Sequence, residues 1–238
     1  MGLVRGELEM SSRQQARRAD IARRLSSPAS ELSRCIVLEC SNPTRAAAGE
    51  GFDRRLCRRH AEQYAVHGSP YRKSYTAAAL KPHRDKARTW LRENDDHPAV
   101  KAARERVRIL YRSAGPQVEA FRLKGLGPKE RARKAWARLR EAGVAPDRVL
   151  EAWLALAFAT AADPEADTRP EFQRVQAAKL IHRLASGTHK QWVVDTGKGQ
   201  TRIERLDVYP RSRGKVLRYL GEDIARACET LLDVASVA

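Results

Sequence analysis

Acidic side chains and long apolar runs are both scarce in this chain. Its 238 residues include 29 Asp and Glu against 46 Lys and Arg, so the formal net charge is +17. No apolar run reaches the roughly 18 residues that a membrane-spanning helix requires. The N-terminal region carries Glu7, Glu9 and Asp20 and has no hydrophobic stretch, so we expect neither a signal peptide nor a membrane anchor. These features favour a cytoplasmic location.

Cysteines and the common catalytic motifs are also few. Four cysteines are too few for a disulfide framework in a chain of this length, which favours a reducing compartment. The sequence contains no Walker loop, no GxGxxG after a strand, no serine nucleophile elbow and no HExxH. We therefore expect a binding protein rather than an enzyme.

The basic excess is concentrated in the middle of the chain. Residues 76–150 contain 19 basic and 9 acidic residues, whereas residues 151–238 contain 13 and 12. A surplus of this size favours a polyanionic partner through counterion release, which leaves RNA, DNA, the ribosome and an acidic membrane open. Many of the cations are arginines, which grip phosphate with two donors and stack on bases, so nucleic acid is the favoured partner.

Prolines mark the starts of several expected helices. The pattern predicts helices over 98–112, 128–141, 146–158 and 170–185, each beginning at a proline, and the third is the most apolar. Residues 11–25 have helix-forming composition but a narrow apolar side, so we interpret them as an arm that orders on a partner.

The C-terminal quarter has a different pattern. Residues 191–209 predict a β-hairpin around a turn at 195–199, and a last helix is expected over 215–234. The predicted fold class is mainly α, with a small zinc-binding module followed by a helical body and one C-terminal hairpin. The expected divisions are a basic arm at 1–32, the module at 33–75, the basic helical body at 76–186 and the hairpin with its helix at 187–238.

Three cysteines and one histidine stand at metal-ligand spacing. Cys35 and Cys40 are followed, after sixteen residues, by Cys57 and His60. Zinc prefers four tetrahedral thiolate and imidazole ligands, and residues three apart at a helix start can both reach one ion. We predict one structural zinc ion held by these four residues, since four protein ligands leave no position for a catalytic water.

The same region is similar to a known module. The run C-x4-C with Pro43, then Arg-Leu-Cys-x2-His and His67-Gly-Ser-Pro, resembles a compact zinc-binding module of phage and bacterial mobile-element proteins. That module often accompanies HNH endonuclease segments or stands alone in proteins assigned to DNA binding. The resemblance covers residues 33–75 and departs from the more usual Gly-Asp-Pro at Ser69. It implies the zinc ligands and a bacterial or phage source.

Other interpretations of these residues stay open. The cysteines can be unrelated buried thiols, and His67 can replace His60 as the fourth ligand. His182 and His189 can meet a metal across a helix end, although such histidines are more often exposed or capping. An HNH centre needs a grouped set of His and Asn residues that the remaining histidines do not show.

Basic residues beside aromatic ones form the candidate nucleic-acid surface, because such mixtures contact phosphate and stack on bases. The alternative is an ordinary solvated basic face, and the helix over 128–141 can equally be a polar outer helix of a bundle. The four tryptophans are interpreted as core anchors. The predicted contacts are Arg54, Arg55, Arg58, Arg59, Arg72, Lys73, Arg131, Arg133 and Lys134.

These patterns together predict a non-enzymatic, zinc-stabilised protein that binds nucleic acid, with DNA favoured over RNA. A protein partner is expected at the nearly neutral C-terminal third. One alternative is an adaptor or assembly subunit of a nucleoprotein complex. The second is an HNH-like nuclease with unrecognised catalytic residues.

Overall fold

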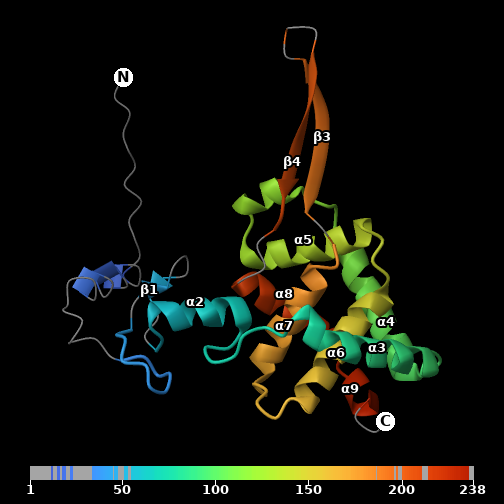
Figure 1. Cartoon of the computed structure of the whole chain (residues 1–238), viewed down its shortest axis with the longest axis horizontal. Helices are drawn as coiled ribbons and strands as arrows, with labels where there is room; N and C mark the ends of the chain where they lie inside the picture. Colours follow the sequence, from blue (N-terminus) through green and yellow to red (C-terminus); the bar gives the residue numbers. More distant parts are fainter. Residues whose placement is uncertain are drawn as a thin grey trace. The chain divides into compact units, whose positions relative to one another are not determined.

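The structure is a computed structural model that divides the chain into two compact units, residues 1–64 and 65–238 (Figure 1). It describes residues 34–44, 46–47, 51–52, 55–185, 187–195, 197, 200–210 and 214–235, together with residues 12, 15, 16, 18, 19, 22 and 23. The described residues between 12 and 23 are helical and exposed, as the pattern over 11–25 predicts. The remainder of the predicted arm lies outside the described residues.

The first unit has little apolar core. A turn over residues 34–43 is followed by a short antiparallel pair, β1 (Ala46–Ala47) and β2 (Gly51–Phe52), and then by helix α2 (Arg58–His67), which begins in this unit. Four of its residues form a small buried cluster, namely Cys35, Leu56, Cys57 and Ala61. A cluster this small needs a further source of stability, such as a bound metal ion.

The second unit is a helical body whose helices begin largely where prolines predict them. A proline occupies the first turn of α4 (Pro98–Ser113), α5 (Pro128–Glu141), α6 (Pro146–Ala162) and α7 (Pro170–His182). Proline suits this position because its missing N–H would have no intrahelical partner there. All four helices are confirmed. The unit also contains α3 (Ala77–Glu93), the 3-10 helix η2 (Ala120–Gly125), α8 (Lys215–Ala227) and α9 (Leu231–Ala235).

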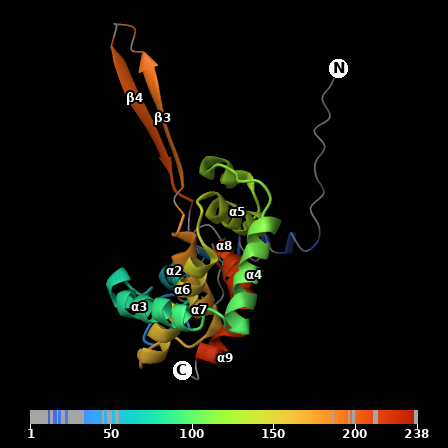
Figure 2. The ribbon, with the colours of Figure 1, turned by 90° about the vertical axis from the view of Figure 1, so that its right-hand side faces the viewer.

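Helix α6 forms the centre of this body, as its apolar composition predicts. It packs against α3, α7 and α4, and its Leu150 and Leu154 are completely buried. Helix α8 packs against α7 and α5. At Gly221 of α8 the backbones approach so closely that a Cβ atom would lie 2.6 Å from the carbonyl oxygen of Arg174. Figure 2 shows α4, α6, α7 and α8 gathered in one bundle.

Two helical features differ from the sequence prediction. Helix α3 was not predicted; it contains Pro82, which removes one backbone hydrogen bond, but Thr76 caps its start by accepting from the N–H of Ala79 at 3.1 Å. The single helix predicted over 215–234 is instead two helices, α8 and α9. They are separated at Cys228, where the N–H of Leu231 donates to the Cys228 carbonyl in a tight turn.

The predicted hairpin is confirmed as strands β3 (Thr188–Asp195) and β4 (Thr201–Val208). They pair antiparallel, with Val193 opposite Ile203. The hairpin projects beyond the helices of the second unit as an arm (Figures 1 and 2). Trp192 lies on this arm and is 44% exposed, so its interpretation as a core anchor was wrong, whereas Trp90, Trp136 and Trp153 are buried as predicted.

The predicted mainly α fold, with an N-terminal Cys3His cluster and a C-terminal hairpin, is therefore confirmed. Among the described helices, none is both long enough and apolar enough to cross a membrane.

Candidate metal centre and basic surface

The first ligand pair lies on a tight turn. The Cys35 N–H donates to the Asn42 carbonyl and the Cys40 N–H donates to the Val37 carbonyl, both at 3.0 Å. Between the two cysteines, Glu39 adopts a φ of 61°, in the left-handed region that a non-glycine residue seldom enters. The turn reverses the chain, so that the two thiols of the pair face one site.

The second ligand pair lies at the start of α2. Cys57 immediately precedes the helix, and its carbonyl accepts from the Ala61 N–H at 2.9 Å. His60 lies three residues further on, on the same face of the first turn. Leu56 is buried beside them and holds this end of the helix against the turn.

All four predicted ligands come together. Cys35 Sγ and Cys57 Sγ lie 3.3 and 3.4 Å from His60 Nδ1, and Cys40 Sγ lies 3.9 Å from Cys57 Sγ. All four ligand atoms lie within 4.8 Å of one another. Zn–S and Zn–N bonds of about 2.3 and 2.0 Å give a tetrahedron with edges of about 3.8 Å between sulfurs and about 3.5 Å between sulfur and nitrogen. The donor set therefore fits one metal ion of this coordination.

Two of the thiols have shifted proton affinities. Hydrogen bonding from Asn42, whose Nδ2 also lies 3.5 Å from Cys40 Sγ, lowers the pKa of Cys40. Burial raises the pKa of the Cys57 thiol. Since a metal ion binds the thiolate form, the Asn42 contact favours ligation at Cys40, while at Cys57 the binding ion must displace the thiol proton, which is released to solvent. The ligand spacing in the sequence gives no sign of this role of Asn42.

The other histidines have different surroundings. His67 Nδ1 accepts from the Ser74 N–H at 3.0 Å and lies 2.8 Å from Ser74 Oγ, so it is His60 that completes the cluster. His182 is buried and His189 pairs with Asp207 on the arm, so the expectation that His182 was exposed or capping was wrong. Within the described ranges, the Cys3His cluster is the one group of three or more potential ligands close enough to hold a metal ion.

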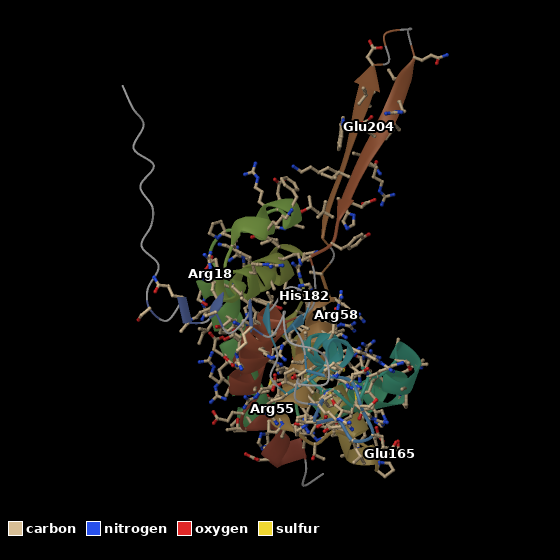
Figure 3. All side chains as sticks on the ribbon, turned by 90° about the vertical axis from the view of Figure 1, so that its left-hand side faces the viewer. Arg18, Arg55, Arg58, Glu165, His182 and Glu204 are labelled. Atoms are coloured by element: carbon tan, nitrogen blue, oxygen red, sulfur yellow. The ribbon has the colours of Figure 1, made fainter. Side chains whose placement is uncertain are left out.

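The basic residues near the cluster are at the surface where the structure describes them. Arg54 lies outside the described residues, whereas Arg55, Arg58 and Arg59 are exposed. Figure 3 labels Arg55 and Arg58. The Arg58 side chain is 71% exposed and pairs with Glu62 at 3.3 Å. A groove of about 460 Å³ runs beside the ligand Cys57 and is lined by Asn42, Pro43, Cys57, Arg58, Arg59 and Glu62.

Arg72 and Lys73 differ in their surroundings. Arg72 forms ion pairs with Asp163 and, at 3.2 Å, with Glu165. Its hydrogen bond lowers the pKa of Asp163. Lys73 is exposed. Arg72 therefore contributes to packing within the second unit, and Lys73 remains available to a partner.

Several basic residues of α5 contact the C-terminal end of α4 or the turn that follows it. Arg133 Nε donates to the Ser113 carbonyl at 2.9 Å and Lys134 Nζ to the Pro116 carbonyl at 3.1 Å. Arg140, which was not among the predicted site residues, donates to the carbonyls of Tyr111 and Gly115. Helix C-termini expose carbonyls that need such partners, and cations there also complement the helix dipole. The Lys134 side chain is only 10% exposed; Arg131 is partly exposed.

No protein-family model matches this chain, and neither a curated protein nor a solved structure matches it. The similarity of residues 33–75 to the mobile-element module therefore rests on the ligand spacing and the residues around it.

Proposed function

We propose that this protein binds one structural zinc ion through Cys35, Cys40, Cys57 and His60 and uses the surface beside that ion to bind nucleic acid, with DNA favoured over RNA. Three sulfurs and one imidazole nitrogen are the donors that zinc takes in structural sites. Four protein ligands fill a tetrahedral ion, so the site supports folding rather than catalysis. The bound ion would order a unit whose buried cluster is otherwise small.

The observation that carries the nucleic-acid proposal is the pair Arg58 and Arg59 in the first turn of α2. Both are exposed, both line the groove beside Cys57, and the first turn contains no acidic residue. Helix N-termini carry a partial positive charge and normally favour acidic residues, so arginines there are electrostatically unfavourable. Arg58 is partly compensated by exposed Glu62 at 3.3 Å, whereas Arg59 has no ion pair among the described residues. A phosphate group is an anion that arginine binds with two donors.

The overall charge supports the same partner. A protein of net charge +17 attracts a polyanion at long range, and phosphate contacts then release counterions. DNA is favoured because the module that residues 33–75 resemble accompanies DNA-acting segments. The exposed hairpin arm supports a second candidate, an adaptor role in a nucleoprotein complex, because it offers apolar side chains to a protein.

The test combines zinc content with a binding titration. Elemental analysis of the purified protein is expected to give one zinc per chain. Binding to labelled duplex DNA, single-stranded DNA and RNA is then measured at several salt concentrations. The double variant R58A/R59A is expected to retain zinc, bind duplex DNA more weakly and lower the slope of log K against log salt by about 2, since each phosphate contact contributes about 0.9.

The matched control is R108A/R112A, which removes the same charge from exposed arginines of α4. Both of these residues pair with Glu105 in the second unit. A control slope close to that of the wild type would place the contact at the first turn of α2. An equal loss of DNA affinity in the two double variants would contradict a specific surface at α2. A wild-type protein that contains zinc but binds no nucleic acid would favour the adaptor role.

A further inference from the structure

The outer part of the hairpin arm exposes apolar side chains on both of its faces. Val193 and Ile203 are 66% and 71% exposed, and they lie opposite each other on one face of the ribbon. Trp192, 44% exposed, lies on the other face with Val194. Within the described residues, β3 and β4 pair only with each other, so each strand has one unpaired edge. A two-stranded ribbon with no packing partner is marginally stable in water.

The charges on the arm do not favour a polyanion. Arg202 pairs with Glu204 and Arg205 pairs with Asp207 at 2.7 Å, while Lys190 pairs with Glu119 at the base. The described part of the arm therefore carries balanced charges, most of which are paired on the arm or with Glu119, in contrast to the basic surface beside Cys57. An apolar ribbon with balanced charge fits a protein surface better than a phosphate backbone.

The sequence of β4 is complementary to itself in one antiparallel register. The N–H and C=O of one residue point to the same edge of a strand, and those of its neighbours point to the opposite edge. A strand that pairs with its own copy therefore places Ile203 opposite Ile203, or Glu204 opposite Glu204, but never a residue opposite its direct neighbour. The register centred on Ile203 sets Arg202 opposite Glu204 of the second copy, twice by symmetry.

The neighbouring registers are less favourable. Centres at Glu204 or Arg205 would bring two like charges directly together. A centre at Leu206 would place the second copy at the base of the arm, close to the helical body. There Thr188 Oγ accepts from the Ala120 N–H at 2.8 Å. The register at Ile203 lies further out, and Figure 3 shows Glu204 on the arm beyond the helices.

We propose that two copies of this chain associate through the free edges of β4, in the antiparallel register centred on Ile203. The result is a four-stranded sheet with one continuous apolar row of Val193, Ile203 and the same two residues of the second copy. Arg202 and Glu204, which pair with each other within one chain, exchange partners across the two-fold axis. A two-fold contact of this kind is closed and does not propagate into fibres.

The first test measures molar mass by sedimentation velocity on the zinc-loaded full chain across a wide range of concentration. The wild type is expected to pass from monomer to dimer. I203K buries a lysine at the axis and is expected to weaken association by roughly tenfold or more. The matched control is I109K, the same substitution at an isoleucine of α4 that is 50% exposed, and it is expected to associate like the wild type.

Charge exchange tests the register. R202E places a carboxylate opposite Glu204 of the second copy and is expected to abolish the dimer. The double variant R202E/E204R restores opposite charges across the axis and is expected to recover it. Recovery is specific to the register at Ile203, because no other centre sets position 202 opposite position 204.

Cross-linking tests the axis itself. In I203C the two new thiols lie on directly opposed residues, whose Cα atoms are about 4.5–5.5 Å apart, within the range of a disulfide. In E204C they are offset by two residues and are about 8 Å apart, beyond that range. Mild oxidation is expected to cross-link I203C and not E204C or the wild type.

A wild type that stays monomeric at all concentrations, or cross-linking that is equal in I203C and E204C, would overturn the proposal. So would a dimer that I203K and I109K leave equally intact. If the wild type is monomeric and I203K nevertheless binds DNA more weakly than the wild type, the dimer proposal fails and the arm is instead a contact for nucleic acid. Since R58A/R59A leaves β4 unchanged, failure of the DNA-binding proposal is distinguishable from failure of this one.

Discussion

Acid should destabilise the helical body through one buried histidine. His182, at the end of α7, is 5% exposed, and its backbone carbonyl accepts from the buried Arg138 at 3.2 Å. Burial lowers the pKa of His182 to about 3, with the charges of Arg138, Arg183 and Arg131 acting in the same direction. In the unfolded chain the same imidazole has a pKa of about 6.5.

The sign follows from which state binds the proton more tightly. Between pH 6.5 and 3 the unfolded chain binds a proton at His182 and the folded chain does not, so the free energy of unfolding falls as the pH falls. The loss is about 1.4 kcal/mol per pH unit in this window, or about 3 kcal/mol between pH 7 and pH 4.5. Above pH 6.5 both states are neutral at this position and the contribution is constant.

The assay is urea unfolding followed by tryptophan fluorescence at pH 7 and at pH 4.5, in the wild type and in H182Q. All four tryptophans lie in residues 65–238, so the signal reports the second unit and is insensitive to zinc loss from the first. The other acid-sensitive groups, including His67, are common to both proteins and cancel in the comparison.

The wild type is expected to lose about 3 kcal/mol more than H182Q between the two pH values. Equal losses, within about 0.5 kcal/mol, would refute the conclusion that His182 stays neutral in the folded state.

Two further variants test the metal centre and the helix packing. Cys57→Ser should lose the metal ion, and with it binding free energy of order 10 kcal/mol, while the tryptophan-detected unfolding of the second unit stays unchanged; elemental analysis and a urea titration check both parts, and retained zinc would contradict the ligand assignment. Gly221→Ala should destabilise the second unit by about 2 kcal/mol, because its Cβ would lie 2.6 Å from the Arg174 carbonyl oxygen. Its control is Gly125→Ala, whose Cβ meets nothing within 4 Å and whose urea midpoint should stay near that of the wild type.

The sequence predicts most of the helical body because the local signals and the packing agree. A proline at the first helical position marks the start of α4, α5, α6 and α7. The apolar composition of α6 predicts that this helix lies at the centre of the body. The metal centre is predicted for a similar reason. Ligand spacing is a local property of the chain, and the geometry of the turn and the helix start then brings the two pairs together.

The structural features that the sequence analysis does not predict depend on contacts between residues far apart in the chain. Pro82 obscures α3, which is held by its packing against α6 and not by a clean helical pattern. Trp192 is a large aromatic residue of the kind usually found in a core, yet it lies 44% exposed on an arm that the described helices do not cover. Burial of this kind is decided by tertiary structure, which periodicity alone does not report.

In the basic middle of the chain, tertiary contacts reduce the number of cations that are free to bind a polyanion. Counted along the sequence, α5 is a candidate polyanion surface. In the structure, however, Arg133 and Arg140 donate to carbonyls in the last turn of α4, and Lys134 donates to the Pro116 carbonyl just beyond it. A cation that satisfies a helix terminus would have to give up that contact to bind a phosphate, so it contributes less to binding than its formal charge suggests. Arg59 lines the groove beside Cys57 with no such internal contact among the described residues. Under the proposed function, the net charge would attract nucleic acid at long range, and the contacts that hold it are expected at the first turn of α2.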